Sequence, residues 1–395
     1  MTDAVLIPRA GSPAARVARG QVLHLSSAHS LLDNRIVEKE CRSLAEAGFQ
    51  VTCVGLPRGD EPSTRALPDG LELVELPRPA GRLARAFSGG RRCLAIALAR
   101  QPDVVHFHDP ELVPWMLVLA ARRRRVVFDV HEDYTTAVER SGWIPGPLKP
   151  AVAAAWRLVE AVCRRAFTIV IAERYYARRF PDATPVLNYP RTDQFAALLD
   201  GVRPPPPSHP RLLYTGDVTL ARGAGLCARL AAAMPEAEVK LVGRTAPALA
   251  RDLERIAGPA GRLTIDGIGA WLPFARIVDA YREPWTAGLA VMPDSPHYRD
   301  KELTKFFEYM AAGLPVIASD FPVWRELFSS TGAGICVDPS DPEALVAAVR
   351  ALHAEPDRAR AMGDAGRRAV RERFNWEGEA RRLVDLYEWL IGGAR

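Results

Sequence analysis

Two kinds of hydrophobic segment are missing from this sequence of 395 residues. No apolar run reaches the roughly 20 residues that a membrane-spanning helix needs. The first residues also lack the apolar core of a signal peptide. We therefore expect a cytoplasmic protein, and the small, basic and aperiodic residues 1–20 predict a loose N-terminal tail.

Paired cysteines are missing as well. The cysteines show no close paired spacing, which argues against a zinc site and a disulfide framework and is typical of a reducing compartment. They are Cys41, Cys53, Cys93, Cys163, Cys227 and Cys336.

An excess of charge is found only in the N-terminal half. The net charge is +5, and residues 1–200 hold 27 Lys and Arg against 22 Asp and Glu. No acid interrupts the arginines between Arg78 and Arg100, and Arg122–Arg125 form a second cluster. Such clusters attract an anionic partner such as a lipid surface. A solvated face in an arginine-rich protein fits equally well.

Short β-branched runs alternate with helical patterns from end to end, which predicts parallel βαβ units. The length favours two such domains. We place a doubly wound domain at residues 21–200 and a second at residues 211–375. Between them, residues 201–210 contain Pro204–Pro207, which neither continue a helix nor donate to a sheet, and so predict a linker. A last helical pattern covers residues 376–395.

The most informative segment runs from Arg299 to Ser319 and predicts a polar loop, an amphipathic helix and a short apolar strand. A helix N-terminus presents unpaired N–H groups and a partial positive charge, which suit a phosphate. Lys301 and Lys305 reinforce that end of the helix. Glu308 lies one turn further in, where a carboxylate can accept hydrogen bonds from a ribose.

The second domain opens with a strand, a glycine loop and a helix at Tyr214–Gly223. Gly216 would let backbone amides approach a pyrophosphate closely, although an ordinary strand-to-helix turn is the alternative. Two later strands end in similar turns at Gly243 and Ile268.

Polar residues follow strand ends in the first domain. His106, His108 and Asp109 end one strand, and His131 ends the next. Two histidines and an aspartate could hold a metal, but no further ligand with helical or strand spacing is evident. We therefore favour polar packing or contact with a substrate.

Asp33 precedes a helical pattern near the start of the first domain and is a candidate N-cap. Contact with a ligand is an equal alternative for this carboxylate. Arg35, two residues later, is a candidate for contact with a donor phosphate or an acceptor pyrophosphate.

These motifs together resemble the nucleotide-sugar glycosyltransferases with the GT-B fold, in particular the retaining group called family four. The resemblance covers residues 21–391 and is most specific from Lys305 to Ser319. It implies two Rossmann-like domains facing a cleft, with a C-terminal helix that crosses back to the first domain. Two positions depart from the pattern, since Asp300 replaces a glutamate and Asp217 an arginine.

The resemblance implies a role for each candidate residue. The catalytic residues would be His131, Asp300 and Lys305. The donor would be bound by Gly216, Arg222, Gly243, Ile268, Lys301, Thr304, Lys305 and Glu308. The acceptor side would hold Asp33, Arg35, His108 and Asp109.

The resemblance also implies a hexosyltransferase that acts with retention on a glycan or lipid-linked acceptor, in cell-surface polysaccharide or glycolipid biosynthesis. We expect a nucleotide sugar as donor, no cofactor, no metal and no nucleic acid. A peripheral contact with an anionic membrane is expected through the two arginine clusters. Two alternatives stay open: a sugar-nucleotide 2-epimerase of the same fold, and a catalytically degenerate subunit that binds a nucleotide or a membrane.

Charge reversal of Arg122–Arg125 to glutamate tests the membrane contact. In low salt the parent protein should sediment with anionic vesicles and the variant should stay in the supernatant, because each basic residue near such a surface contributes about 1 kcal/mol. Four charge reversals among residues 201–395 form the control. Unchanged sedimentation of the Arg122–Arg125 variant would reject the contact.

Overall fold

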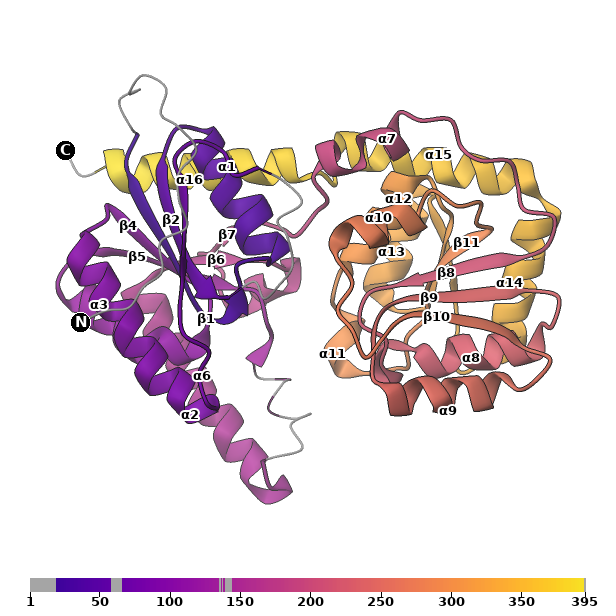
Figure 1. Cartoon of the computed structure of the whole chain (residues 1–395), viewed down its shortest axis with the longest axis horizontal. Coiled ribbons are helices and arrows are strands. Elements are labelled where there is room, and N and C mark those ends of the chain that lie inside the picture. The colour runs from indigo at the N-terminus through magenta and orange to yellow at the C-terminus, as the bar shows by residue number, and fades with distance from the viewer. Residues whose placement is uncertain (1–18, 58–65, 135, 137, 139–143, 394–395) are drawn as a thin grey trace. The chain divides into compact units, whose positions relative to one another are not determined.

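The computed structural model describes residues 19–57, 66–134, 136, 138 and 144–393. The predicted tail lies outside these ranges except for its last two residues. The chain divides into two compact α/β units, which Figure 1 shows by colour along the sequence. The first, the N-terminal unit, runs to Asn188 and includes Glu377 onward; the second, the C-terminal unit, comprises Tyr189–Trp376.

The N-terminal unit is built on a seven-stranded sheet in the order β3-β2-β1-β4-β5-β6-β7. Every strand pair in it is parallel. The strands are β1 (Gln21–Ser30), β2 (Gln50–Leu56), β3 (Leu71–Glu75), β4 (Val104–Phe107), β5 (Arg125–Val130), β6 (Thr168–Ile171) and β7 (Thr184–Pro185).

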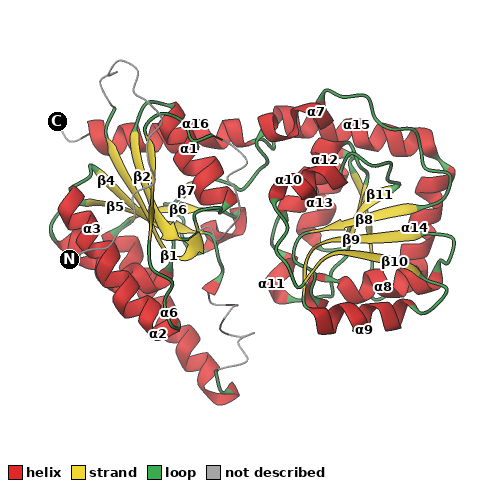
Figure 2. Ribbon diagram, viewed as in Figure 1, coloured by secondary structure: helices red, strands yellow, loops and turns green. Residues whose placement is uncertain are grey.

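Helices connect these strands and cover both faces of the sheet (Figure 2). A π-helical segment (Asn34–Cys41) leads into α1, and another (Arg85–Gly89) joins α2 to α3. The α-helices are α1 (Arg42–Glu46), α2 (Arg82–Ala84), α3 (Gly90–Arg100), α4 (Val113–Ala121), α6 (Lys149–Ala166) and α16 (Trp376–Gly392). Short 3-10 turns lie at Pro110–Leu112, Gly146–Leu148 and Arg174–Arg178.

The C-terminal helix α16 packs on the N-terminal sheet. Leu383 and Tyr387 are fully buried there. The backbone N–H of Leu187 donates to Glu379 at 3.0 Å, and Glu388 pairs with Arg19. The predicted return of this helix to the first domain is therefore confirmed.

The C-terminal unit holds a six-stranded parallel sheet in the order β10-β9-β8-β11-β12-β13. Its strands are β8 (Arg211–Thr215), β9 (Glu238–Thr245), β10 (Arg262–Ile268), β11 (Ala287–Ala290), β12 (Val316–Ser319) and β13 (Gly334–Val337). Together with the first sheet, this confirms the prediction of two doubly wound domains.

Helices cover both faces of the second sheet as well (Figure 2). They are α7 (Ala196–Leu199), α8 (Ala224–Ala233), α9 (Pro247–Ala257), α10 (Phe274–Ala280), α11 (Pro296–Arg299), α12 (Thr304–Ala312), α13 (Pro322–Thr331), α14 (Pro342–Ala354) and α15 (Pro356–Glu372). Short 3-10 turns lie at Thr192–Phe195 and Leu220–Arg222. Among the described residues, no helix has the length and apolar character to cross a membrane.

The boundary between the units differs from the predicted one. Residues 189–200, expected in the first domain, belong to the second unit. The reason is aromatic packing: the Tyr189 ring lies 4.7 Å from that of Phe307, and the Phe195 ring lies 6.0 Å from that of Tyr281. The polyproline run therefore lies within the C-terminal unit and does not separate the two.

Helix α12 also differs from its prediction as amphipathic. Every residue from Lys305 to Ala312 is buried. The helix packs against strands β11 and β12 and against helix α15, so both of its sides are covered. Its charged residues, Lys305 and Glu308, are therefore buried as well, and a buried charge requires a compensating partner.

Candidate functional site

The carboxyl end of β8 brings the glycine loop and α12 together. Gly216 has a positive φ of 95°, which an L side chain rarely adopts. A Cβ at this position would lie 4.0 Å from the Cε atom of Lys305. The Tyr309 hydroxyl accepts a hydrogen bond from the backbone N–H of Thr215 at 3.0 Å and so fixes α12 to the strand end.

Lys305 is the most unusual charged group of the C-terminal unit. Its ammonium is buried, and it has no hydrogen-bond partner among the described residues. The nitrogen lies 3.4 Å from the centroid of the Tyr214 ring, which offers a cation–π contact. Burial, together with the nearby charge of Arg222, lowers the pKa of Lys305 to about 7. A bound anion would relieve both effects.

Two arginines lie at the glycine loop, and the charge of one of them, Arg222, acts on this ammonium. Arg222 ends the short 3-10 turn after β8 and is half-buried. Arg244, near the end of β9, places its guanidinium 3.3 Å from the Asp217 carboxylate. Asp217 is thus paired with an arginine that the sequence reasoning did not single out, because it lies on the next strand.

Glu308 is held by a tyrosine from another element. The Tyr281 hydroxyl donates to the Glu308 carboxylate at 2.7 Å and lies 3.0 Å from the Thr215 hydroxyl oxygen. Tyr281 is fully buried, so this contact orients the carboxylate firmly. No local pattern marks Tyr281, which directly follows α10.

The residues before α12 are also brought to this region. Asp300 directly follows α11, and Thr304 is the first residue of α12. The Lys301 nitrogen lies 3.0 Å from a ring nitrogen of His297. Leu303, which precedes the helix, has no side-chain oxygen to cap the first N–H groups of α12. The helix N-terminus thus stays suited to a phosphate.

Gly243, the other glycine predicted to bind the donor, lies where two strand ends pack too closely to leave room for a side chain. A Cβ at Gly243 would lie 1.9 Å from the carbonyl oxygen of Gly216. Ile268, at the end of β10, is 44% exposed and is available for contact with a ligand.

In the N-terminal unit, the Asp129 carboxylate contacts three other side chains. Its carboxylate accepts from the Arg35 guanidinium at 2.8 and 3.0 Å. It lies 3.2 Å from the Nδ1 atom of His108 and 3.4 Å from that of His131. Burial opposes its ionisation, but Arg35 and the two histidines hold the pKa of Asp129 well below its usual range.

Arg35 and His108 are more deeply placed than predicted. The Arg35 guanidinium also donates to the carbonyl of Val186 at 2.9 Å. His108 is fully buried. The imidazole is enclosed between His24 and Asp129, and its contact with an acceptor stays a prediction.

His29 lies beside His131 and was not singled out from the sequence. Its Nε2 atom is 3.1 Å from that of His131, and its Nδ1 atom is 3.3 Å from Asp33. Burial opposes protonation, yet the hydrogen bond with Asp33 and the charges of Asp109 and Asp33 raise the pKa of His29 to about 9. Protonated His29 can therefore donate to His131.

The two aspartates on this side order the loop after β1. Asp33 caps the following helical segment, since it accepts from the N–H groups of Arg35 and Ile36 at 2.9 Å. Asp109 is buried and accepts from the Ser26 hydroxyl at 2.7 Å and from the Ser27 N–H at 2.6 Å. The capping alternative for Asp33 is thus observed, and its contact with a ligand stays a prediction.

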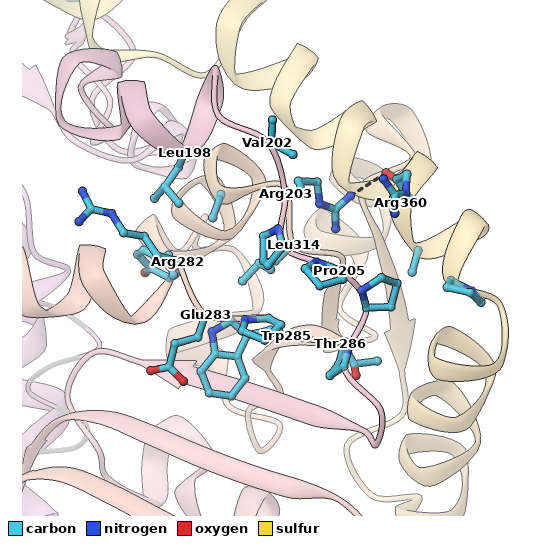
Figure 3. A pocket seen from close by; sticks show the side chains of 18 of the residues that line it. Leu198, Val202, Arg203, Pro205, Arg282, Glu283, Trp285, Thr286, Leu314 and Arg360 are labelled. Carbon is cyan, nitrogen blue, oxygen red and sulfur yellow. Dashed lines mark hydrogen bonds between the residues drawn. The ribbon is translucent and has the colours of Figure 1, made fainter.

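A pocket of about 300 Å³ lies elsewhere in the C-terminal unit, at the polyproline run (Figure 3). Its lining includes Arg203, Trp285, Thr286 and Arg360. Thr286 immediately precedes β11, so the pocket lies at the amino end of that strand. Because open α/β sheets bind ligands at the carboxyl ends of their strands, we assign this pocket no part in the site.

Two family models match the chain, one in each half. Residues 34–186 match Glycosyltransferase Family 4, and residues 225–385 match a glycosyl transferase-like family. A D-inositol 3-phosphate glycosyltransferase of Xylanimonas cellulosilytica is 31% identical over 46% of this chain and 43% of its own length. A phosphatidyl-myo-inositol mannosyltransferase of Mycolicibacterium smegmatis is 27% identical over 73% of this chain and 72% of its own.

Solved structures share the fold. Sucrose-phosphate synthase from Thermosynechococcus elongatus superposes with a TM-score of 0.73 and 19% identity, over 95% of this chain and 100% of that one. HepE of Anabaena, in complex with UDP-glucose, has a TM-score of 0.67 and 10% identity, over 93% and 99% of the two chains. Both comparisons extend over two doubly wound domains, which is the GT-B arrangement.

The Lys305→Met variant tests whether burial of this lysine lowers the free energy of unfolding. Between pH 7 and 10.5 the unfolded chain binds more protons than the folded one, so the free energy of unfolding of the parent protein should rise with pH. The variant should lose this rise, worth roughly 1.4 kcal/mol per pKa unit, and should be the more stable protein near pH 7. Urea unfolding at pH 7 and pH 9.5 measures both.

Lys240→Met is the control for this comparison. Burial opposes protonation of Lys240, but the hydrogen bond and charge of Glu283 raise its pKa. The Lys240→Met variant should therefore keep the rise in the free energy of unfolding between pH 7 and pH 9.5. An identical pH dependence in the parent and Lys305→Met proteins would contradict the assignment.

Proposed function

We propose that the chain is a glycosyltransferase of family four, which transfers a hexose from a nucleotide-diphosphate donor to a glycan or lipid-linked acceptor. Three groups from two elements support the donor half of this proposal. The buried Lys305 ammonium, which has no hydrogen-bond partner among the described residues, and the N-terminus of α12 lie with Arg222 at one glycine loop. An isolated buried charge is costly, and a diphosphate would neutralise it.

The donor roles follow from this arrangement. Lys305, Arg222 and the first N–H groups of α12 bind the diphosphate, and the backbone at Gly216 lets it approach. Glu308, oriented by Tyr281, accepts hydrogen bonds from the ribose hydroxyls. The loop that follows β10 at Ile268 contacts the base.

The chemical step is proposed to proceed with retention. As the glycosidic bond lengthens, negative charge develops on the leaving diphosphate, and Lys305 and Arg222 stabilise that charge more than the ground state. Asp300 contacts the donor sugar, and a contact of His131 with that sugar stays what the family resemblance implies. Protonated His29 and ionised Asp129 hold His131 from opposite sides, which selects one tautomer of its imidazole.

No metal is needed for the leaving group in this scheme, because lysine, arginine and the helix dipole supply the positive charge. No pair of catalytic carboxylates is needed either, in contrast to glycoside hydrolysis.

The acceptor is proposed to carry a phosphate or a lipid. The names of two relatives describe transfer involving inositol 3-phosphate and phosphatidyl-myo-inositol. In the N-terminal unit, Leu83 and Phe87 are 76% and 67% exposed, beside the exposed Arg82, Arg91 and Arg92. Exposed apolar side chains flanked by arginines suit a peripheral contact with an anionic membrane. Cell-surface polysaccharide or glycolipid biosynthesis would place the acceptor at that membrane.

A thermal-shift screen with UDP, GDP, ADP and dTDP sugars identifies the donor base. The preferred donor should raise the unfolding temperature, because it binds the folded state alone. Incubation of that donor with a lipid extract then separates the candidate activities: a transferase makes a glycosylated product, whereas a 2-epimerase converts the sugar nucleotide without an acceptor.

Lys305→Ala should lower turnover of the preferred donor at least about tenfold, since one charge-assisted hydrogen bond is worth roughly 1.5–3 kcal/mol. Glu308→Gln should weaken donor binding, and Tyr281→Phe should do so to a smaller extent. The matched control is Lys240→Ala, which removes a lysine on β9 that pairs with Glu283. Unchanged kinetics in Lys305→Ala would remove this residue from the site.

A further inference from the structure

Next to Asp129, the interior of the N-terminal unit holds three imidazoles and a carboxylate. His24 comes from β1, His106 from β4, His108 from the residue after β4 and Glu40 from the π-helical segment before α1. All four side chains are completely buried. The sequence reasoning found no third ligand near His106 and His108, because His24 and Glu40 are distant in sequence and reach them only through the pairing of β1 with β4 and the helical segment above it.

The ligand atoms of these residues surround one point. The Nδ1 atom of His24 lies 3.1 Å from the Nε2 atom of His108. The Oε2 atom of Glu40 lies 3.8 Å from the first and 3.9 Å from the second. One atom from each of the four residues, His106 included, lies within 4.8 Å of the other three. Ligands about 2.0–2.1 Å from a tetrahedral Zn²⁺ are about 3.3 Å apart, which these separations approach.

Several of these buried polar atoms make no hydrogen bond. Neither oxygen of Glu40 nor the Nε2 atom of His106 has a hydrogen bond to any described residue. Buried polar atoms are almost always satisfied, so each of these needs an explanation. One bound cation would satisfy Glu40 and His106 together.

The opposite atom of each candidate ligand is already occupied. The Nδ1 atom of His108 lies 3.2 Å from Asp129, and the Glu40 Oε1 atom lies 3.1 Å from the Arg35 guanidinium. The Tyr387 hydroxyl lies 2.7 Å from the Nδ1 atom of His106 and 3.4 Å from the Nε2 atom of His24. Its oxygen has two lone pairs and can accept from both imidazoles.

This arrangement leaves His24 Nδ1, His106 Nε2 and His108 Nε2 as the inward-facing acceptors. Metal-binding histidines generally donate their other N–H to a carboxylate, carbonyl or water in the same way.

We propose that His24, Glu40, His106 and His108 bind one Zn²⁺ ion. Three imidazoles and one carboxylate form a donor set suited to Zn²⁺, whereas Mg²⁺ and Ca²⁺ require oxygen ligands. The ion would hold β1 and β4 to the helical segment before α1, with α16 in its outer shell through Tyr387. Its role is structural, because all four ligands are protein side chains. It also supports Asp129 and hence the imidazole of His131.

The test uses tag-free protein expressed in medium with zinc and dialysed against a chelator. Because the site is fully buried, the ion enters during folding, and elemental analysis should find about one zinc per chain. Tyr387→Phe keeps the shape of the ring but removes the oxygen that orients two ligands, and it should lower zinc affinity about 10–100-fold. His353→Ala, in the C-terminal unit, should retain zinc as the parent does. Protein expressed without zinc should unfold at a lower temperature.

Cobalt substitution provides a readout that needs no variant. Protein expressed with Co²⁺ should show the intense visible absorption of a tetrahedral cobalt site, and X-ray absorption at the zinc edge should show nitrogen and oxygen ligands near 2.0 Å. Absence of stoichiometric zinc together with absence of the cobalt band would overturn the proposal. So would zinc retained with equal affinity in Tyr387→Phe and Glu40→Gln. None of these measurements depends on glycosyl transfer.

Discussion

The C-terminal unit is organised around a positive charge that the protein itself does not neutralise. The Lys305 ammonium is enclosed by α12, the end of β8 and the face of the Tyr214 ring. A charge of this kind costs free energy on folding, and proteins retain such groups where a ligand compensates them. The glycine loop, the start of α12 and Arg222 lie around it, so the diphosphate that we propose to bind there would offset this cost.

The N-terminal unit fixes the orientation of several imidazoles, His131 among them. Asp129 does this through Arg35, His108 and His131. Each contact is buried or nearly so, which fixes the positions of the rings. The proposed zinc ion would also hold His108 in place, since His108 is both a zinc ligand and a partner of Asp129. His131 is thus held by a continuous set of contacts that begins at Tyr387 on α16.

The sequence allowed both sheets, the main helices and the donor segment to be predicted, because each depends on a local period or a short motif. Glu308 and Lys305 were identified in this way. Tyr281, Arg244 and His29 were missed, because each acts on a site residue from another element and leaves no local pattern. The burial of α12 was missed for the same reason, since α15 covers a side that the sequence predicts to face water. Arg35 and His108 were singled out, but their burial was not predicted, because it depends on side chains that come from other elements.

Calorimetric titration of the preferred nucleoside diphosphate at pH 8, in two buffers of different ionisation enthalpy, tests the central claim most directly. A diphosphate beside Lys305 stabilises the ammonium and raises its pKa from about 7, so binding should take up a proton. The account predicts uptake in the parent protein and its loss in Lys305→Met. Binding without proton uptake, or equal uptake in the two proteins, would contradict it.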